Sequence, residues 1–187
     1  MPHIALNSPE PGIRGLFHYR PETARPLNQL AEVLLRGDST LTRGERELIA
    51  AYVSSLNNCL FCTSSHSAFA AAQLPEGMAL VTRVRADPET ADLPAKLKAL
   101  LDIAAAVQQS GRDVTGELVQ AATAAGATDL EIHDTVLIAA AFCMFNRYVD
   151  GLGTWAPEDP AAYAEAAEQI VTMGYSADRY QAEQPAR

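Results

Sequence analysis

Two cysteines and one histidine lie close together in the sequence, at Cys59, Cys62 and His66. Residues three or four positions apart share one face of a helix, so a helical segment would gather all three side chains on one side. In the first turn of a helix, unpaired backbone N–H groups and the helix dipole favour a thiolate, and a neighbouring imidazole can accept the thiol proton. This spacing therefore supplies a nucleophilic thiol, its base and a second thiol able to close a disulfide.

Glu47 is a fourth candidate, twelve residues before Cys59. In one straight helix these two residues would be about 18 Å apart, at 1.5 Å per residue. Asn57 and Asn58 stand between them, and asparagine both tolerates the left-handed conformation that ends a helix and caps the start of the next one. A tight turn there would fold the first helix back along the second. Glu47 would then lie near the thiols, where a carboxylate could orient His66 or relay a proton.

Apolar residues at helical spacing, with clear start and stop signals, surround these candidates. A first amphipathic helix is expected over residues 22–35, ended by Gly37. Thr42 and Glu45 have the spacing of a capping box, which predicts the helix that carries Glu47. The next helix is expected to have Cys59 in its first turn and to run to about Gln73. In the remaining chain, the pattern predicts a short helix and a connection in 75–93, and helices over about 94–109, 115–125, 129–150 and 160–173. Thr128 and Glu131 have a second capping-box spacing at the start of the helix expected over 129–150.

These helices predict an all-α fold in one domain over residues 1–187, because a chain of this length supports one proper core and is short for two. Residues 1–21 hold four of the eleven prolines, and we expect them to form an arm that packs on the body or on a neighbouring subunit. Residues 175–187 are expected to form a polar tail.

Composition excludes several classes of function. The formal net charge of −9 disfavours contact with phosphate backbones, so we expect no nucleic-acid partner. No apolar stretch approaches the roughly 18 residues that span a bilayer, and the N-terminus lacks the pattern of a signal peptide. The odd number of cysteines, three, does not fit a secreted disulfide scaffold. We therefore expect a cytoplasmic protein without membrane contact, in which a close cysteine pair serves catalysis or metal binding.

The segment from Glu47 to His66 resembles the alkylhydroperoxidase D family, in the branch described as peroxidase-related, within the carboxymuconolactone decarboxylase-like superfamily. The matching pattern is Glu-x11-Cys-x2-Cys-x3-His, and the later stretch 142–153, FCMFNRYVDGLG, is also similar to that branch. The resemblance covers roughly residues 42–153.

This resemblance implies a helical, homo-oligomeric protein and a thiol-dependent peroxidase mechanism. Cys62 would attack a hydroperoxide and become a sulfenic acid, and Cys59 would resolve it to a disulfide that a dithiol or thioredoxin-like partner reduces. His66 would be the base for Cys62, with Glu47 in the proton relay. The prototype peroxidases have a further relay histidine between the two cysteines, whereas this sequence has Phe61 there.

Other interpretations of the same residues remain open. The cysteine pair could cycle as a redox sensor or as a general thiol–disulfide oxidoreductase without efficient peroxide turnover. Zinc would need a fourth ligand, and His3, His18 and His133 form no pair that could supply it, so we expect no metal site. No phosphate loop is present and we expect no cofactor. Decarboxylase or hydrolase activity on lactone-type substrates ranks lower, because those relatives lack the thiol pair.

Three further features late in the chain have ordinary structural explanations. Cys143 lies in an apolar helix and is interpreted as a small buried residue. His133 is interpreted as part of a solvated face. Asn146, Arg147 and Asp150 are polar groups late in a buried helix, and are expected to pair with one another or across a subunit interface.

Overall fold

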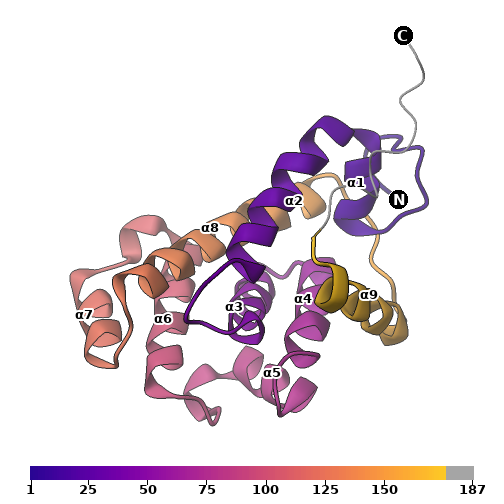
Figure 1. The fold of residues 1–187 in the computed structure, drawn as a ribbon. Coiled ribbons are helices and arrows are strands. Elements are labelled where there is room, and N and C mark those ends of the chain that lie inside the picture. Colours follow the sequence, from indigo (N-terminus) through magenta and orange to yellow (C-terminus); the bar gives the residue numbers. More distant parts are fainter. Residues whose placement is uncertain (176–187) are drawn as a thin grey trace.

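The computed structural model describes residues 1–175, and the part of the expected polar tail after residue 175 lies outside them. Within this range the chain is helical and contains no strand, which confirms the all-α expectation (Figure 1). The helices are α1 (Gly12–Tyr19), α2 (Pro21–Arg36), α3 (Arg43–Leu56), α4 (Leu60–Ala71), α5 (Gly77–Ala86), α6 (Ala95–Gln109), α7 (Gly116–Ala124), α8 (Asp129–Gly151) and α9 (Pro160–Met173), with short 3-10 turns at Pro88–Thr90 and Gly111–Asp113.

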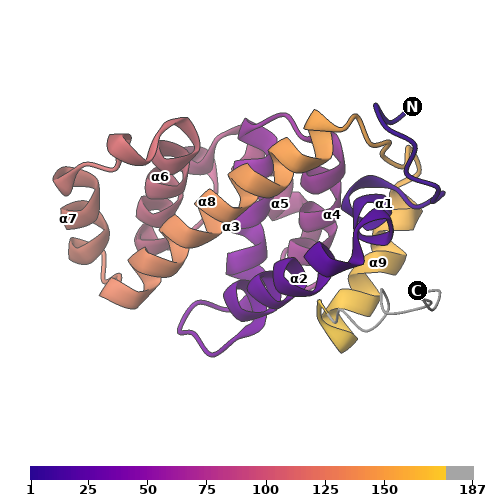
Figure 2. The same cartoon turned by 90° about the horizontal axis from the view of Figure 1, so that it is seen from above.

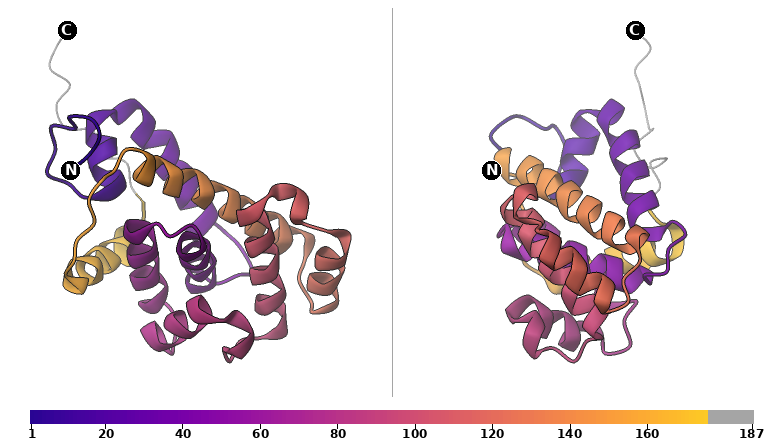
Figure 3. Two further views of the ribbon diagram at one scale, coloured as in Figure 1. Left: turned by 180° about the vertical axis from the view of Figure 1, so that it is seen from behind. Right: turned by 90° about the vertical axis from the view of Figure 1, so that its left-hand side faces the viewer.

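The centre of the molecule is the helical hairpin formed by α3 and α4, which pack closely on each other. The long helix α8 crosses the molecule, packing on α3 and α6, and it connects the end that carries α7 with the end that carries α1 and α9 (Figure 2). The contact of α9 with α4 closes the side of the hairpin away from α6 (Figure 3). The main core lies among α2, α3, α6 and α8, so the hairpin is held from several directions.

Two helices begin at the capping boxes that the sequence predicts. The hydroxyl of Thr42 accepts from the backbone N–H of Glu45, and the Glu45 carboxylate accepts from the backbone N–H of Thr42. Thr128 and Glu131 form the same reciprocal pair at the start of α8. Each box satisfies backbone donors that a helix start would otherwise leave unpaired, and so fixes where α3 and α8 begin.

The N-terminal arm packs on the body of the same chain, which is one of the two arrangements expected, but its residues 12–19 form helix α1, which was not predicted. Helical spacing alone does not indicate α1, because the helix is short and prolines stand on both sides of it. Gly12 opens α1 with a positive φ of 55°, a conformation that glycine adopts without strain. Among residues 1–175, no helix combines the length and the apolar character needed to cross a membrane.

Candidate active site

The turn between α3 and α4 brings the candidate residues together. Asn57 ends α3, Asn58 has a positive φ of 58°, and Cys59 is the N-cap of α4. The turn is therefore where the sequence predicts it, but Cys59 lies one position before the first helical residue rather than inside the first turn. Cys62 is the residue in the first turn, and it lies near the unpaired N–H groups and the positive end of the helix dipole.

Buried amide groups fix this turn to the neighbouring helices. The Asn57 side chain donates to Asn146 of α8 at 2.8 Å and accepts from Gln108 of α6 at 3.0 Å. Asn146 is buried and donates in turn to the Ser54 hydroxyl at 3.1 Å. The expected pairing of Asn146 with Arg147 and Asp150 is not what the structure shows, because Asn146 faces α3 instead. Its role is to hold the turn that positions the cysteines.

Glu47 and His66 form a buried pair between α3 and α4. Glu47 Oε2 lies 2.7 Å from His66 Nδ1, and both side chains are almost completely removed from solvent. The rings of Phe142 and Phe69 meet the imidazole edge-on, with centroids 4.5 and 5.1 Å away. A carboxylate bonded to Nδ1 holds the proton there and leaves Nε2 with its lone pair. The pair is thus oriented as a carboxylate-supported base.

Tyr175 completes this pair, and sequence reasoning missed it by placing it in a polar tail. Its hydroxyl donates to Glu47 Oε1 at 2.6 Å, and its ring stacks on the imidazole of His66 with an interplanar angle of 14°. Burial, together with the adjacent Glu47 carboxylate, raises the pKa of Tyr175 well above its ordinary value, so it remains a donor. The residue therefore belongs to the site.

The end of α9 is built to direct Tyr175 inward. Gly174 has φ 75° and ψ −166°, a conformation essentially confined to glycine, and the backbone N–H of Tyr175 donates to Glu32 of α2 at 2.7 Å. Arg36, also on α2, donates to the carbonyl of Ile170 in the last turn of α9 at 2.8 Å. The sequence signal that could have indicated this is Gly174 followed by Tyr175: a glycine directly after a helix lets the chain change direction, and an aromatic residue next to it favours a return to the core.

The two thiols differ in their surroundings. No disulfide joins Cys59 and Cys62; Cys59 is fully buried, and Cys62 is 4% exposed. The hydrogen bond between the Cys59 and Cys62 side chains, followed by burial, raises the pKa of Cys59 far above its ordinary value. Cys59 is therefore held as a protonated thiol behind Cys62.

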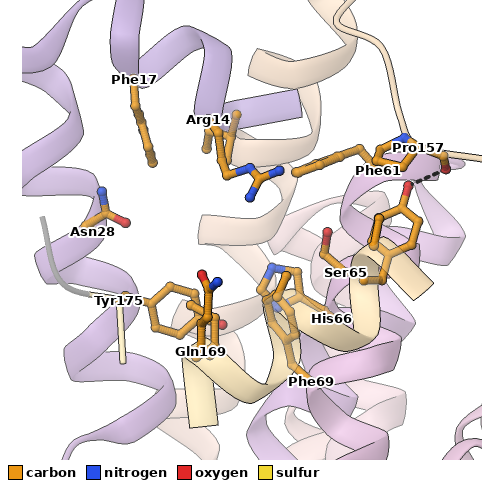
Figure 4. A pocket seen from close by; sticks show the side chains of 15 residues that line it. Arg14, Phe17, Asn28, Phe61, Ser65, His66, Phe69, Pro157, Gln169 and Tyr175 are labelled. Carbon is orange, nitrogen blue, oxygen red and sulfur yellow. Dashed lines mark hydrogen bonds between the residues drawn. The ribbon is translucent and has the colours of Figure 1, made fainter. Parts of the chain in front are cut away.

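A cleft reaches Cys62 and His66 from the surface between α1, α2, α4 and α9. It consists of two adjoining cavities of about 100 and 60 Å³, which share the side chains of Phe17, Phe61, His66 and Tyr175 among others. Cys62 lines the smaller cavity, and His66 lines both; Figure 4 shows His66 in the larger one. The remaining walls are mostly apolar. An apolar molecule entering this cleft would meet the thiol and the imidazole together.

Phe61 forms a wall of this cleft. Its ring packs so closely on Gly12 at the start of α1 that a Cβ atom on Gly12 would lie 2.3 Å from the ring. Its centroid also lies 6.3 Å from that of Tyr163 in α9. At the position where the prototype peroxidases carry a relay histidine, this chain has an aromatic ring that helps to hold α1 and α9 on α4.

The other candidate residues lie outside the site. Cys143 is partly buried and packs on the main core, with the Asn57 amide 3.5 Å from its sulfur. His133 is exposed and lies 3.0 Å from Asp134, as expected for a solvated face. Arg147 donates to the carbonyl of Cys143 within α8. Among residues 1–175, no three His, Cys, Asp or Glu side chains are grouped as metal ligands.

The fold and the site define an all-helical protein with a paired-cysteine centre beside a buried carboxylate–imidazole pair. Residues 21–74, which include all four predicted site residues, match the carboxymuconolactone decarboxylase family. The chain is also similar to the alkylhydroperoxidase AhpD core of Ralstonia eutropha JMP134, an uncharacterized peroxidase-related protein, with 27% identity and a TM-score of 0.74 over 82% of this chain and 79% of that one.

A second similar structure is an uncharacterized peroxidase-related protein from Silicibacter sp. TM1040, with 25% identity and a TM-score of 0.74 over 82% of this chain and 78% of that one. The comparison with curated proteins gives no match. Together, the family match over residues 21–74 and the two structures support the assignment of this chain to the alkylhydroperoxidase D-like, carboxymuconolactone decarboxylase superfamily.

Proposed function

We propose that this protein is a two-cysteine peroxidase, which reduces organic hydroperoxides through a Cys59–Cys62 disulfide cycle. The observation that carries the proposal is the asymmetry of the two thiols: Cys62 lines the cleft with His66, whereas Cys59 is buried behind it with a raised pKa. An attacking thiol must reach the substrate and lose its proton, and a resolving thiol needs neither before the first step. The peroxidase-related names of the two similar structures support the same activity.

In the first step, Cys62 passes its proton to His66 Nε2, and the resulting thiolate attacks the terminal oxygen of the hydroperoxide. The O–O bond breaks, Cys62 is oxidised to a sulfenic acid, and the departing alkoxide takes the proton from His66 to leave as an alcohol. Glu47, held by Tyr175, stabilises the imidazolium that exists between the two proton transfers.

In the second step, the protonated Cys59 thiol attacks the sulfur of the Cys62 sulfenic acid. The S–S bond forms, and the hydroxyl group leaves with the Cys59 proton as water. A dithiol or thioredoxin-like reductant then exchanges with the disulfide, becomes oxidised itself and restores both thiols. Cys59 and Cys62 lie at the N-cap and in the first turn of one helix, three residues apart, which keeps the second thiol within reach.

The direct test is steady-state consumption of cumene hydroperoxide with a dithiol reductant, followed for the wild type, Cys62→Ser and Cys143→Ser. We expect many turnovers per site for the wild type and for Cys143→Ser, and none above background for Cys62→Ser. A wild type that is no faster than Cys62→Ser would contradict the proposal.

A second function is favoured by one observation, the absence of a titratable side chain at Phe61. A site without that relay group could form its disulfide once and then signal or exchange thiols without efficient peroxide turnover. The number of hydroperoxide molecules reduced per protein separates the two functions. One per protein in the presence of excess dithiol indicates a redox sensor, and many indicate a peroxidase.

A further inference from the structure

Arg14 brings a positive charge into an otherwise apolar cleft. Its side chain extends from α1 towards the space between Phe61, His66 and Gln169 (Figure 4). Among the described residues that line the two cavities, Arg14 is the single side chain with a permanent charge. Its charged partner is Glu10, and the Arg14 side chain is 37% exposed, so an incoming ligand can reach it.

The hydrogen-bonding capacity of this guanidinium is largely unused within residues 1–175. Arg14 Nε is buried and lies 3.0 Å from Glu10 Oε2, but without the alignment of a hydrogen bond. The pair is half-exposed, and such pairs contribute little to stability. Buried donors without an acceptor are rare in folded proteins and mark strain or a missing partner. The planar guanidinium matches a carboxylate, which accepts two parallel N–H bonds.

The remainder of the cleft suits an apolar body. Phe17 and Phe61 lie near Arg14 (Figure 4), and Phe69 and Ile170 belong to a small apolar cluster on which Tyr175 packs. A molecule with its carboxylate at Arg14 would extend over these side chains towards the smaller cavity that Cys62 lines. Burial of each CH2 group there would contribute about 0.8 kcal/mol to binding.

We infer that the cleft binds hydroperoxides that combine an apolar body with a carboxylate, and that Arg14 selects them by binding the carboxylate. The inference rests on the proposed peroxidase function for the reaction, and on Arg14 and the cleft for the substrate class. Arg14 is thus a specificity residue that contacts the end of the substrate away from the peroxide. The net charge of −9 repels anions from the protein as a whole, so the local positive charge of Arg14 is needed to attract a carboxylate to the cleft.

The binding claim can be tested without any peroxide. Octanoate and octanol have the same chain length and differ in charge, and either one in the cleft should shield Cys62 from the neutral reagent iodoacetamide. We expect octanoate to protect the wild type at lower concentrations than octanol. Arg14→Gln should weaken protection by octanoate roughly tenfold, as expected for the loss of a charge-assisted hydrogen bond, and leave octanol unchanged.

Two matched variants sharpen this result. Arg14→Lys keeps the charge and loses the planar pair of donors, so octanoate protection should be intermediate. Glu10→Gln removes the competing carboxylate and should strengthen protection by octanoate. Equal protection by octanoate and octanol in the wild type, or an equal loss of both in Arg14→Gln, would overturn the inference.

The catalytic consequence is measured with cumene hydroperoxide and its ring-carboxylated analogue. We expect Arg14→Gln to lower kcat/KM for the carboxylated substrate roughly tenfold and to leave the neutral one within about twofold. An equal fall for both substrates would place Arg14 at the peroxide group instead and contradict its assignment to the carboxylate. Absence of turnover with either substrate, together with intact octanoate protection, would refute the peroxidase proposal and leave the binding claim standing.

Discussion

Replacement of Tyr175 by phenylalanine isolates one hydrogen bond in the proposed proton relay. The substitution removes the hydroxyl that donates to Glu47 Oε1 at 2.6 Å, while the ring can keep its stacking on His66. Glu47 then retains its contact with His66 Nδ1 but loses its second partner. The negative charge of the Glu47–His66 pair is less well stabilised, so the pair binds an additional proton more tightly.

The size of this effect follows from the kind of bond that is lost. A hydrogen bond to a charged group contributes about 1.5–3 kcal/mol, and 1.36 kcal/mol corresponds to one pH unit. We take the lower end of this range as the conservative value. The acid limb of Cys62 reactivity should move to higher pH by about one unit. On that limb the rate should fall about tenfold, and at higher pH it should return to the wild-type value.

The assay is the rate of Cys62 alkylation by iodoacetamide as a function of pH, with the modified peptide identified by mass spectrometry. Tyr163→Phe is the matched control, because its hydroxyl also lies at the wall of the cleft but donates to the carbonyl of Pro157. It should leave the pH profile unchanged. An unshifted profile for Tyr175→Phe, or a uniform loss at every pH, would refute the role of the hydroxyl in the relay.

Three further predictions concern the supports of the site. Gly12→Ala places a Cβ 2.3 Å from the Phe61 ring at a positive φ, so thermal unfolding should show a loss of about 2 kcal/mol in the free energy of unfolding. Gly116→Ala is the control, because a Cβ there meets open space and should leave stability unchanged. Gly174→Ala should cost about 1–3 kcal/mol, since φ 75° with ψ −166° suits glycine alone. Because Gly174 directs Tyr175 inward, this variant should also slow Cys62 alkylation on the acid limb, as Tyr175→Phe does. An unchanged pH profile would mean that Tyr175 reaches Glu47 without this glycine. Burial opposes ionisation of Glu131, but hydrogen bonds from Lys96, Thr128 and Thr40 lower its pKa to about 2. The ionised Glu131 therefore stabilises the fold fully at pH values above its unfolded pKa of about 4.5. This contribution is lost as the pH falls towards 2. Glu131→Gln should therefore lose about 3 kcal/mol in denaturant unfolding at pH 7, and a smaller difference from wild type should be measured at pH 3.

The local parts of the site were predictable because local chemistry determines them. The capping boxes at Thr42 and Thr128 and the turn at Asn57 and Asn58 each depend on side chains within a few residues of the backbone groups that they satisfy. Once that turn exists, the hairpin of α3 and α4 follows, and Glu47 must lie near His66. The position of Cys59 differs by one residue, because helix boundaries depend on cap geometry that sequence patterns resolve poorly.

The parts that sequence reasoning missed depend on contacts between distant segments. Helix α1 is short and lies between prolines, and its place is determined by Phe61, which comes some fifty residues later. Tyr175 follows the last helix and reaches Glu47 only because Glu32 and Arg36 of α2 hold the end of α9. Neither contact has a periodic pattern, so composition and spacing favoured an arm without a helix and a polar tail instead.

The central claim is that Cys62 attacks the hydroperoxide and that Cys59 resolves the product. Cys59→Ser removes the resolving thiol, so one equivalent of cumene hydroperoxide should leave a sulfenic acid on Cys62, which dimedone traps and peptide mass spectrometry locates. The account predicts dimedone on Cys62 in Cys59→Ser and a Cys59–Cys62 disulfide in the wild type. Dimedone on Cys59 in Cys62→Ser, with an unmodified Cys62 in Cys59→Ser, would contradict it.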